Sequence, residues 1–219
     1  MQHRKSGTSA TSGARPRRER SGAGSNGASV QERRARPHFG RGETCRRAGR
    51  FQAAADAYRC AVDLHPANPL YRFRLGDSLS AAGLLDDAQP HLEAACALDP
   101  ENGFYHFWLG DLYLRQGRME EAASEFELAS AHSPVDHYYS ARLGAIYLRI
   151  GLAHRAARAL LQAVGLCPDD ACYHYLLGDT YMNLGAERQA LLHYRKAARL
   201  SLNDSGYLER LRRLTVGAR

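Results

Sequence analysis

A pattern that recurs every 34 residues constrains the fold of this chain more than any other feature. Its clearest copy spans residues 103–136, and it contains a Leu-Gly pair, a second glycine, two alanines and a proline at fixed offsets. The recurring positions are Leu75-Gly76, Leu109-Gly110, Leu143-Gly144 and Leu177-Gly178, then Gly49, Gly83, Gly117, Gly151 and Gly185, then Pro66, Pro100, Pro134 and Pro168. A fixed period of this length is typical of a solenoid, in which each unit packs on its neighbours.

Within one unit the apolar residues predict two helices. Leu109 and Tyr113 share one side of a helix with 3.6 residues per turn, and Ala122 and Phe126 do the same after the break. Gly117 lies between the two runs, where a glycine can take the left-handed conformation that ends a helix. Each unit is therefore expected to be an antiparallel helix pair, with no strand in residues 69–204.

The order of Leu-Gly, an aromatic residue or leucine, Gly, Ala, a further aromatic residue or leucine, Ala and Pro resembles the tetratricopeptide repeat family. The resemblance covers about Ala35 to Asp204. It departs from the family's pattern where a large aromatic residue usually precedes the leucine by three positions. Polar residues stand there, and each follows a tyrosine that we interpret as a shifted packing residue: Tyr71-Arg72, Tyr105-His106, Tyr139-Ser140 and Tyr173-His174.

We therefore predict an all-α fold, an α-solenoid of about five antiparallel helix pairs. The repeat domain is expected over residues 41–204, and residues 205–219 are expected to form a C-terminal capping helix. The units are predicted at about residues 35–68, 69–102, 103–136, 137–170 and 171–204. The first helix of the first unit is expected to be short and frayed, over residues 39–48, because Arg41 replaces the leucine.

Residues 1–40 carry nine Lys and Arg against Glu19 and Glu32, and their net charge of +7 equals that of the whole chain. They are rich in Arg, Ser and Gly, so we predict a disordered basic tail. This stretch contains no apolar run that resembles a signal sequence or a membrane span. Association with nucleic acid is conceivable only through this tail.

The sequence offers no catalytic or cofactor-binding motif that fits the repeat. A GxGxxG string at residues 22–27 lacks the preceding strand that a dinucleotide site needs. The odd number of cysteines, five, and the absence of a CxxC pair indicate reduced thiols and a cytoplasmic protein. Cys167, Cys172 and His174 are the one conceivable metal group from sequence, and without an evident fourth ligand we predict no metal and no cofactor.

In tetratricopeptide folds the first helices line a concave groove, and the resemblance implies that this groove binds a protein or peptide. The residues expected there are Phe73, Arg74, Asp77, Phe104, Phe107, Trp108, Asp111, Arg115, Tyr138, Arg142, Arg149, Tyr175, Asp179 and Asn183. An alternative for Phe107 and Trp108 is that they fill the seam between adjacent first helices.

The predicted function is therefore a non-catalytic scaffold for protein interactions. The alternatives are a regulatory or targeting subunit of a larger enzyme assembly, and nucleic-acid association through the basic tail. A salt-dependent shift with random nucleic acid that disappears on deletion of residues 1–40 would favour the last of these. The identity of the partner does not follow from the residues.

Overall fold

A computed structural model describes residues 29–201, and every regular element in that range is an α-helix. The ten helices confirm the predicted all-α fold. They are α1 (Val30–Arg47), α2 (Phe51–Leu64), α3 (Pro69–Ala81), α4 (Leu85–Leu98), α5 (Gly103–Arg115), α6 (Met119–His132), α7 (His137–Arg149), α8 (Ala153–Leu166), α9 (Ala171–Asn183) and α10 (Glu187–Leu200). The predicted capping helix over residues 205–219 lies outside the described residues.

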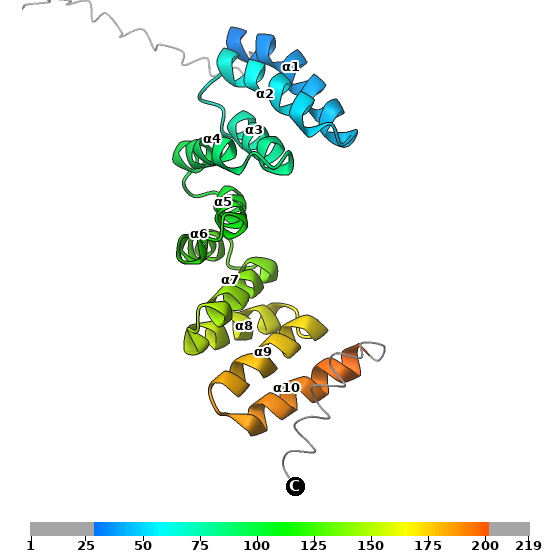
Figure 1. The fold of residues 1–219 in the computed structure, drawn as a ribbon, viewed down its shortest axis with the longest axis vertical. Coiled ribbons are helices and arrows are strands. Elements are labelled where there is room, and N and C mark those ends of the chain that lie inside the picture. The colour runs from blue at the N-terminus through cyan, green and yellow to red at the C-terminus, as the bar shows by residue number, and fades with distance from the viewer. Residues whose placement is uncertain (1–28, 202–219) are drawn as a thin grey trace, which may run out of the picture.

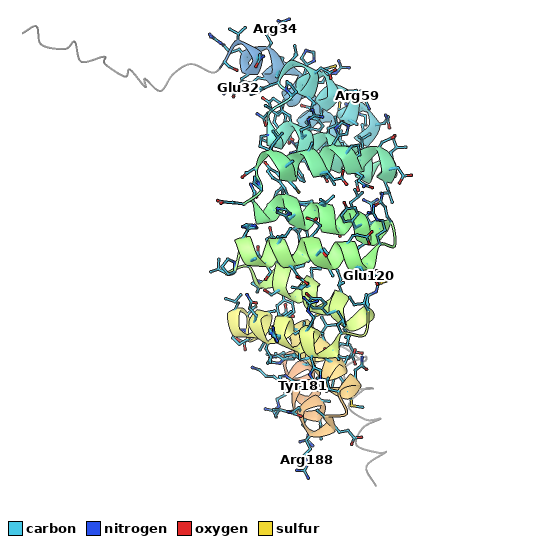
Figure 2. All side chains as sticks on the ribbon, turned by 90° about the vertical axis from the view of Figure 1, so that its left-hand side faces the viewer. Glu32, Arg34, Arg59, Glu120, Tyr181 and Arg188 are labelled. Carbon is cyan, nitrogen blue, oxygen red and sulfur yellow. The ribbon has the colours of Figure 1, made fainter. Side chains whose placement is uncertain are left out.

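The helices stack in chain order into a curved column, with α1 and α2 at one end and α9 and α10 at the other (Figure 1). In this view α3 and α5 lie on the right of the column, towards which both ends bend, and α4 and α6 lie on the left. Figure 2 turns the column so that this left side faces the viewer, with Glu120 of α6 at the right margin about halfway down and Arg188 of α10 at the lower end. We call the side that carries the first helices of the central pairs the inner face.

Polar side chains fix where the first helices begin. In each pair from the second onward, an Asn or Asp precedes the helix, and its side chain accepts a hydrogen bond from a backbone N–H of the first turn. These capping residues are Asn68, Asn102, Asp136 and Asp170, and they follow the 34-residue period.

Glycines with a positive φ end the first helices, as the sequence predicts. Gly117 has φ +80°, which lets the Arg118 N–H donate to the Tyr113 carbonyl at 2.9 Å and the Gly117 N–H donate to the Leu114 carbonyl at 3.0 Å. This is the Schellman arrangement, which satisfies carbonyls at the helix end. The equivalent glycines Gly49, Gly83, Gly151 and Gly185 also have positive φ.

The glycine of the Leu-Gly pair allows the two helices of a unit to approach closely. At Gly110 an added Cβ would lie 3.1 Å from the Phe126 ring and 3.3 Å from the Ala122 carbonyl oxygen. Leu109 and Phe126 are buried beside this crossing. The shifted tyrosines of the sequence pattern are buried as well, so their interpretation as packing residues is confirmed: Tyr71, Tyr105, Tyr139 and Tyr173.

The first helix differs from the prediction. Helix α1 begins at Val30 and has 18 residues, so the expected disorder is wrong for residues 30–40, and the helix is not limited to residues 39–48. The Ser29 side chain caps it by accepting from the Glu32 N–H at 3.1 Å. Its buried face uses small residues, including the fully enclosed Ala35, which hydrophobic periodicity does not detect. The remainder of the predicted tail, residues 1–28, lies outside the described residues.

Candidate functional site

Aromatic rings connect the first helices of the central repeats. Phe73 of α3 lies 4.8 Å from the Phe104 ring centroid and 6.1 Å from that of Trp108, both on α5. The Phe107 ring lies 5.4 Å from that of Tyr138 on α7. These contacts run from one repeat to the next along the inner face, because α3, α5 and α7 are first helices of consecutive pairs.

Two of these predicted groove residues lie in the core. Phe73 is 1% exposed and Phe107 is 7% exposed. Phe107 also packs on Phe126 of α6 and Tyr139 of α7, with ring centroids 5.2 and 4.9 Å away. Phe107 therefore fills the seam between repeats, which was the alternative left open by the sequence.

Other aromatic residues of this chain of contacts reach the surface. Phe104 is 40% exposed and Tyr138 is 47% exposed. Trp108 is half-buried, since one part of it packs against the core and Phe104 lies beside it at 6.2 Å between centroids. We call Phe104, Trp108 and Tyr138 the aromatic patch.

Charged groups beside the patch form contacts between neighbouring repeats. Arg142 of α7 donates to Asp111 of α5 at 2.8 Å, and its guanidinium lies 5.7 Å from the Phe126 ring centroid. Arg115 of α5 donates to the Ser80 carbonyl at 2.7 Å and also contacts the Ser80 hydroxyl. These predicted groove residues thus join neighbouring repeats.

Towards the first repeat the charges converge further. Arg74 forms an ion pair with Glu43 of α1 at 2.9 Å, and Glu43 also accepts from the buried Tyr58 hydroxyl at 2.7 Å. Burial raises the pKa of Asp77, while the nearby Arg74 and Arg46 guanidinium groups oppose the rise. Opposite charges are therefore interleaved along this part of the inner face.

The remaining predicted residues belong to the later repeats. Arg149 is exposed at the last position of α7, and Asn183 is exposed at the last position of α9. Asp179 accepts a hydrogen bond from the Tyr194 hydroxyl at 2.6 Å, and Tyr175 is half-buried with its ring centroid 5.7 Å from that of Tyr194. Tyr175 and Asp179 therefore pack against the second helix of their own pair.

Sequence reasoning missed a set of polar contacts at the position that follows each shifted tyrosine. His106 is buried, and its Nε2 lies 2.9 Å from the Pro100 carbonyl oxygen while its Nδ1 lies 2.8 Å from Glu125. His174 makes equivalent contacts, with Nε2 3.0 Å from the Pro168 carbonyl oxygen and Nδ1 3.0 Å from Nδ1 of His193. The interval of 19 residues between His106 and Glu125 recurs between His174 and His193, and this spacing was the sequence signal that could have revealed the contacts.

Arg72 repeats this arrangement, because its Nε donates to the Pro66 carbonyl at 3.2 Å and its Nη1 lies 3.5 Å from His91. In the fourth pair the position is Ser140, which pairs with the Ser130 hydroxyl at 3.1 Å. Arg72, His106 and His174 therefore hold the closing turn of one repeat to the next helix pair. Ser140 instead contacts the preceding helix α6.

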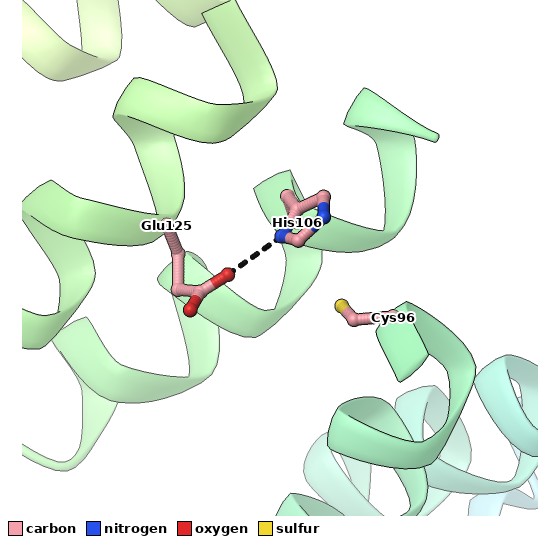
Figure 3. A group of neighbouring side chains, drawn as sticks. All are labelled: Cys96, His106 and Glu125. Atoms are coloured by element: carbon pink, nitrogen blue, oxygen red, sulfur yellow. Dashed lines mark hydrogen bonds and ion pairs between the residues drawn. The ribbon is translucent and has the colours of Figure 1, made fainter. Parts of the chain in front are cut away.

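A cysteine lies beside one of these contacts. Cys96, His106 and Glu125 offer three ligand atoms within 4.8 Å of one another, from α4, α5 and α6 (Figure 3). Burial raises the pKa of the Cys96 thiol to about 12. The group considered from the sequence, Cys167, Cys172 and His174, is not among the sets whose ligand atoms lie this close together within residues 29–201.

A surface depression of about 380 Å³ lies one repeat further along, among α6, α7 and α8. Ser130 and Ala159 line it, and they stand 34 residues after Cys96 and Glu125. Arg155 closes one side by pairing with Glu127 at 2.7 Å. The depression therefore occurs where smaller residues replace the buried polar group of the preceding repeat.

None of the helices within residues 29–201 is both long and apolar enough to span a membrane.

The repeat, the helix pairs and their glycine breaks define a class of α-solenoid, and sequence comparison identifies the family. The chain belongs to the tetratricopeptide repeat family: one sequence profile of the family matches residues 27–69 and 73–137, and a second matches residues 173–204. Such solenoids present extended concave surfaces for binding, so the chain is classed with protein-interaction scaffolds. No curated protein sequence matches the chain at a significant level.

Solved structures with the same fold cover most of the chain. A crystal structure of MamA superposes with a TM-score of 0.72 at 22% identity, covering 79% of this chain and 94% of that one. MamA from Desulfovibrio magneticus RS-1 superposes with a TM-score of 0.71 at 20% identity, covering 78% of this chain and 97% of that one. A crystal structure of YrrB is described as that of a tetratricopeptide repeat protein with an unusual peptide-binding site. It superposes with a TM-score of 0.71 at 18% identity, covering 80% of this chain and 90% of that one.

Proposed function

We propose that this chain binds an extended peptide segment of a protein partner along the inner face of its second to fourth repeats, with the aromatic patch as the main contact. The observation that carries the proposal is the exposure of Phe104 and Tyr138, 40% and 47%, on neighbouring first helices. Each ring packs against a buried phenylalanine, so the patch is rigidly supported while its outer edges remain open. Supported aromatic residues contribute much of the binding energy at protein interfaces.

The charges beside the patch favour a peptide with both apolar and polar residues. The Arg142–Asp111 and Arg74–Glu43 pairs are partly exposed and contain both signs. Partial exposure leaves room for further hydrogen bonds to peptide carbonyls and side chains, and interleaved charges discriminate between partners more than they add affinity. The other predicted groove residues, Arg149, Tyr175, Asp179 and Asn183, would extend the groove towards the fifth repeat.

We further propose that the chain is not an enzyme and acts in the cytoplasm. The buried titratable groups described above take part in contacts between helices, including His106 with Glu125 and His174 with His193. All five cysteines are free, which supports a reducing compartment. YrrB, which shares the fold, is described as having an unusual peptide-binding site, and this supports a peptide as the kind of partner.

The experiment is selection of peptides on the purified full chain from a displayed library, followed by titration of the selected peptides. Trp108 is the single tryptophan, so its fluorescence reports binding at the patch directly. We expect each selected peptide to change this fluorescence, and we expect Tyr138→Ala or Phe104→Ala to weaken binding at least about 10-fold.

Leu128→Ala is the matched control, since Leu128 lies on the second helix α6 and is 40% exposed, as Phe104 is. It should leave the affinity unchanged. Equal weakening by Leu128→Ala, or full affinity in both patch variants while they retain the helical circular dichroism of the parent, would refute the proposed surface.

A further inference from the structure

The contact between the second and third repeats contains three different metal-ligand types. Figure 3 shows the side chains of Cys96, His106 and Glu125 approaching one another from separate helices, with the His106–Glu125 contact drawn as a dashed line. One ligand atom from each lies within 4.8 Å of the other two. A thiolate, an imidazole and a carboxylate are the three side-chain ligands that zinc uses in proteins.

The surroundings of His106 suit a metal ligand. Its Nε2 faces the Pro100 carbonyl oxygen at 2.9 Å, so an Nε2–H can donate there and leave Nδ1 directed at Glu125. Metal-ligating histidines usually donate their other ring N–H to a carbonyl or carboxylate, which fixes the ring. Both Cys96 and His106 are 7% exposed, so the group is enclosed between repeats.

The same position in the other described repeats lacks this set of donors. Val62 and Val164 stand in the register of Cys96, and Ala159 stands in the register of Glu125. The equivalent contacts of Arg72 and His174 use a histidine partner and a proline carbonyl, with no thiol in the register position. Across residues 29–201 the combination is therefore particular to the third repeat and its junction with the second.

We propose that Cys96, His106 and Glu125 bind one zinc ion, with Nδ1 of His106 as its nitrogen ligand and a water molecule as the fourth ligand. A thiolate and a carboxylate together carry two negative charges, which balance the dication. Zinc bonds of about 2.0–2.3 Å place ligand atoms roughly 3.3–3.8 Å apart in a tetrahedron. Nδ1 of His106 and the Glu125 carboxylate, which are 2.8 Å apart, must therefore separate by about 0.5 Å, while ligand atoms as far apart as 4.8 Å must approach by about 1 Å. The ion would connect α4 to α5 and α6 and hold the second repeat on the third.

The test uses the full chain, reduced and free of an affinity tag, titrated with Co²⁺ as a spectroscopic probe and then with Zn²⁺. We expect one Co²⁺ per chain, with the visible bands of a tetrahedral site and a thiolate-to-cobalt charge-transfer band. Equimolar Zn²⁺ should remove these bands and raise the thermal midpoint, because an ion that binds the folded chain stabilises it.

The variants are chosen from the equivalent positions of other repeats. Cys96→Val introduces the residue found at Val62 and Val164, and Glu125→Ala introduces the residue found at Ala159. Either should abolish the charge-transfer band or the stoichiometric uptake while keeping the helical circular dichroism. Cys60→Ser, at an exposed cysteine, should leave the spectrum unchanged. The absence of Co²⁺ uptake by the parent chain, bands that survive Cys96→Val, or bands lost instead in Cys172→Ser would overturn the proposal.

Discussion

Replacing Gly144 by alanine should destabilise the chain, although alanine is the better helix former. An added Cβ at Gly144 would lie 2.5 Å from Cγ and 2.9 Å from Cδ2 of Leu160, and 3.3 Å from the Ala156 carbonyl oxygen. Leu160 is fully buried and its Cγ is a branch point, so the clash can be relieved only if α7 and α8 move apart.

The magnitude follows from two opposing effects. Extra volume in a packed core costs about 1–3 kcal/mol, whereas exchanging glycine for alanine in a helix gains about 0.5–1 kcal/mol. The clash should dominate, because its nearest partner is the Cγ branch point of the fully buried Leu160 and not the mobile end of a side chain. We expect a net loss of about 1–2 kcal/mol, which lowers the thermal midpoint by about 2–8 °C for a domain of this size.

Urea unfolding followed by circular dichroism measures this loss. Gly165→Ala is the matched control, because Gly165 lies in α8 and no heavy atom stands within 4 Å of its added Cβ. That variant should match the parent or be more stable by up to about 1 kcal/mol. If Gly144→Ala were as stable as Gly165→Ala, the close approach of α7 and α8 would be refuted.

Two further predictions concern buried polar contacts. Tyr58→Phe should lower the free energy of unfolding in urea by about 1.5–3 kcal/mol, because the buried hydroxyl donates to the Glu43 carboxylate at 2.7 Å. Tyr138→Phe, at an exposed ring, should cause no measurable loss of stability. An equal loss in both variants would contradict this assignment. Burial lowers the pKa of both His174 and His193 from 6.5, so unfolding takes up protons below that pH and stability should fall as the pH drops from about 6.5 towards 5. His193→Gln keeps a donor for His174 and should flatten this pH dependence, and an unchanged slope would exclude the pair as its source.

The sequence predicted the helix pairs because glycine and the Leu-Gly pair act locally. A positive φ at Gly117 and a close helix crossing at Gly110 both need a residue without a side chain, so the glycines in the sequence pattern directly predict the turn and the crossing. The full length of helix α1 was not predicted, because its sequence lacks the recurring Leu-Gly pair. Arg41 stands at the leucine position and Pro37 interrupts the pattern, yet Ala35 still packs fully against its neighbours.

The candidate site was only partly predictable, because first helices of a solenoid contact neighbours on several sides. Phe73 and Phe104 both belong to the predicted inner face, but the former is enclosed by the following repeat and the latter reaches the surface. Helical periodicity gives the direction of a side chain and not what the next repeat places over it. The buried contact of His106 with Glu125 and Pro100 joins separate segments and depends on the same tertiary arrangement.

Hydrogen exchange of the full chain, with and without a selected peptide, tests the central claim most directly. If the inner face of the second to fourth repeats binds the peptide, amide exchange should slow in α3, α5 and α7 around the aromatic patch, while α4, α6 and α8 remain unchanged. Protection confined to α4, α6 and α8 by a peptide that binds at the same concentration would contradict the assignment of the binding surface.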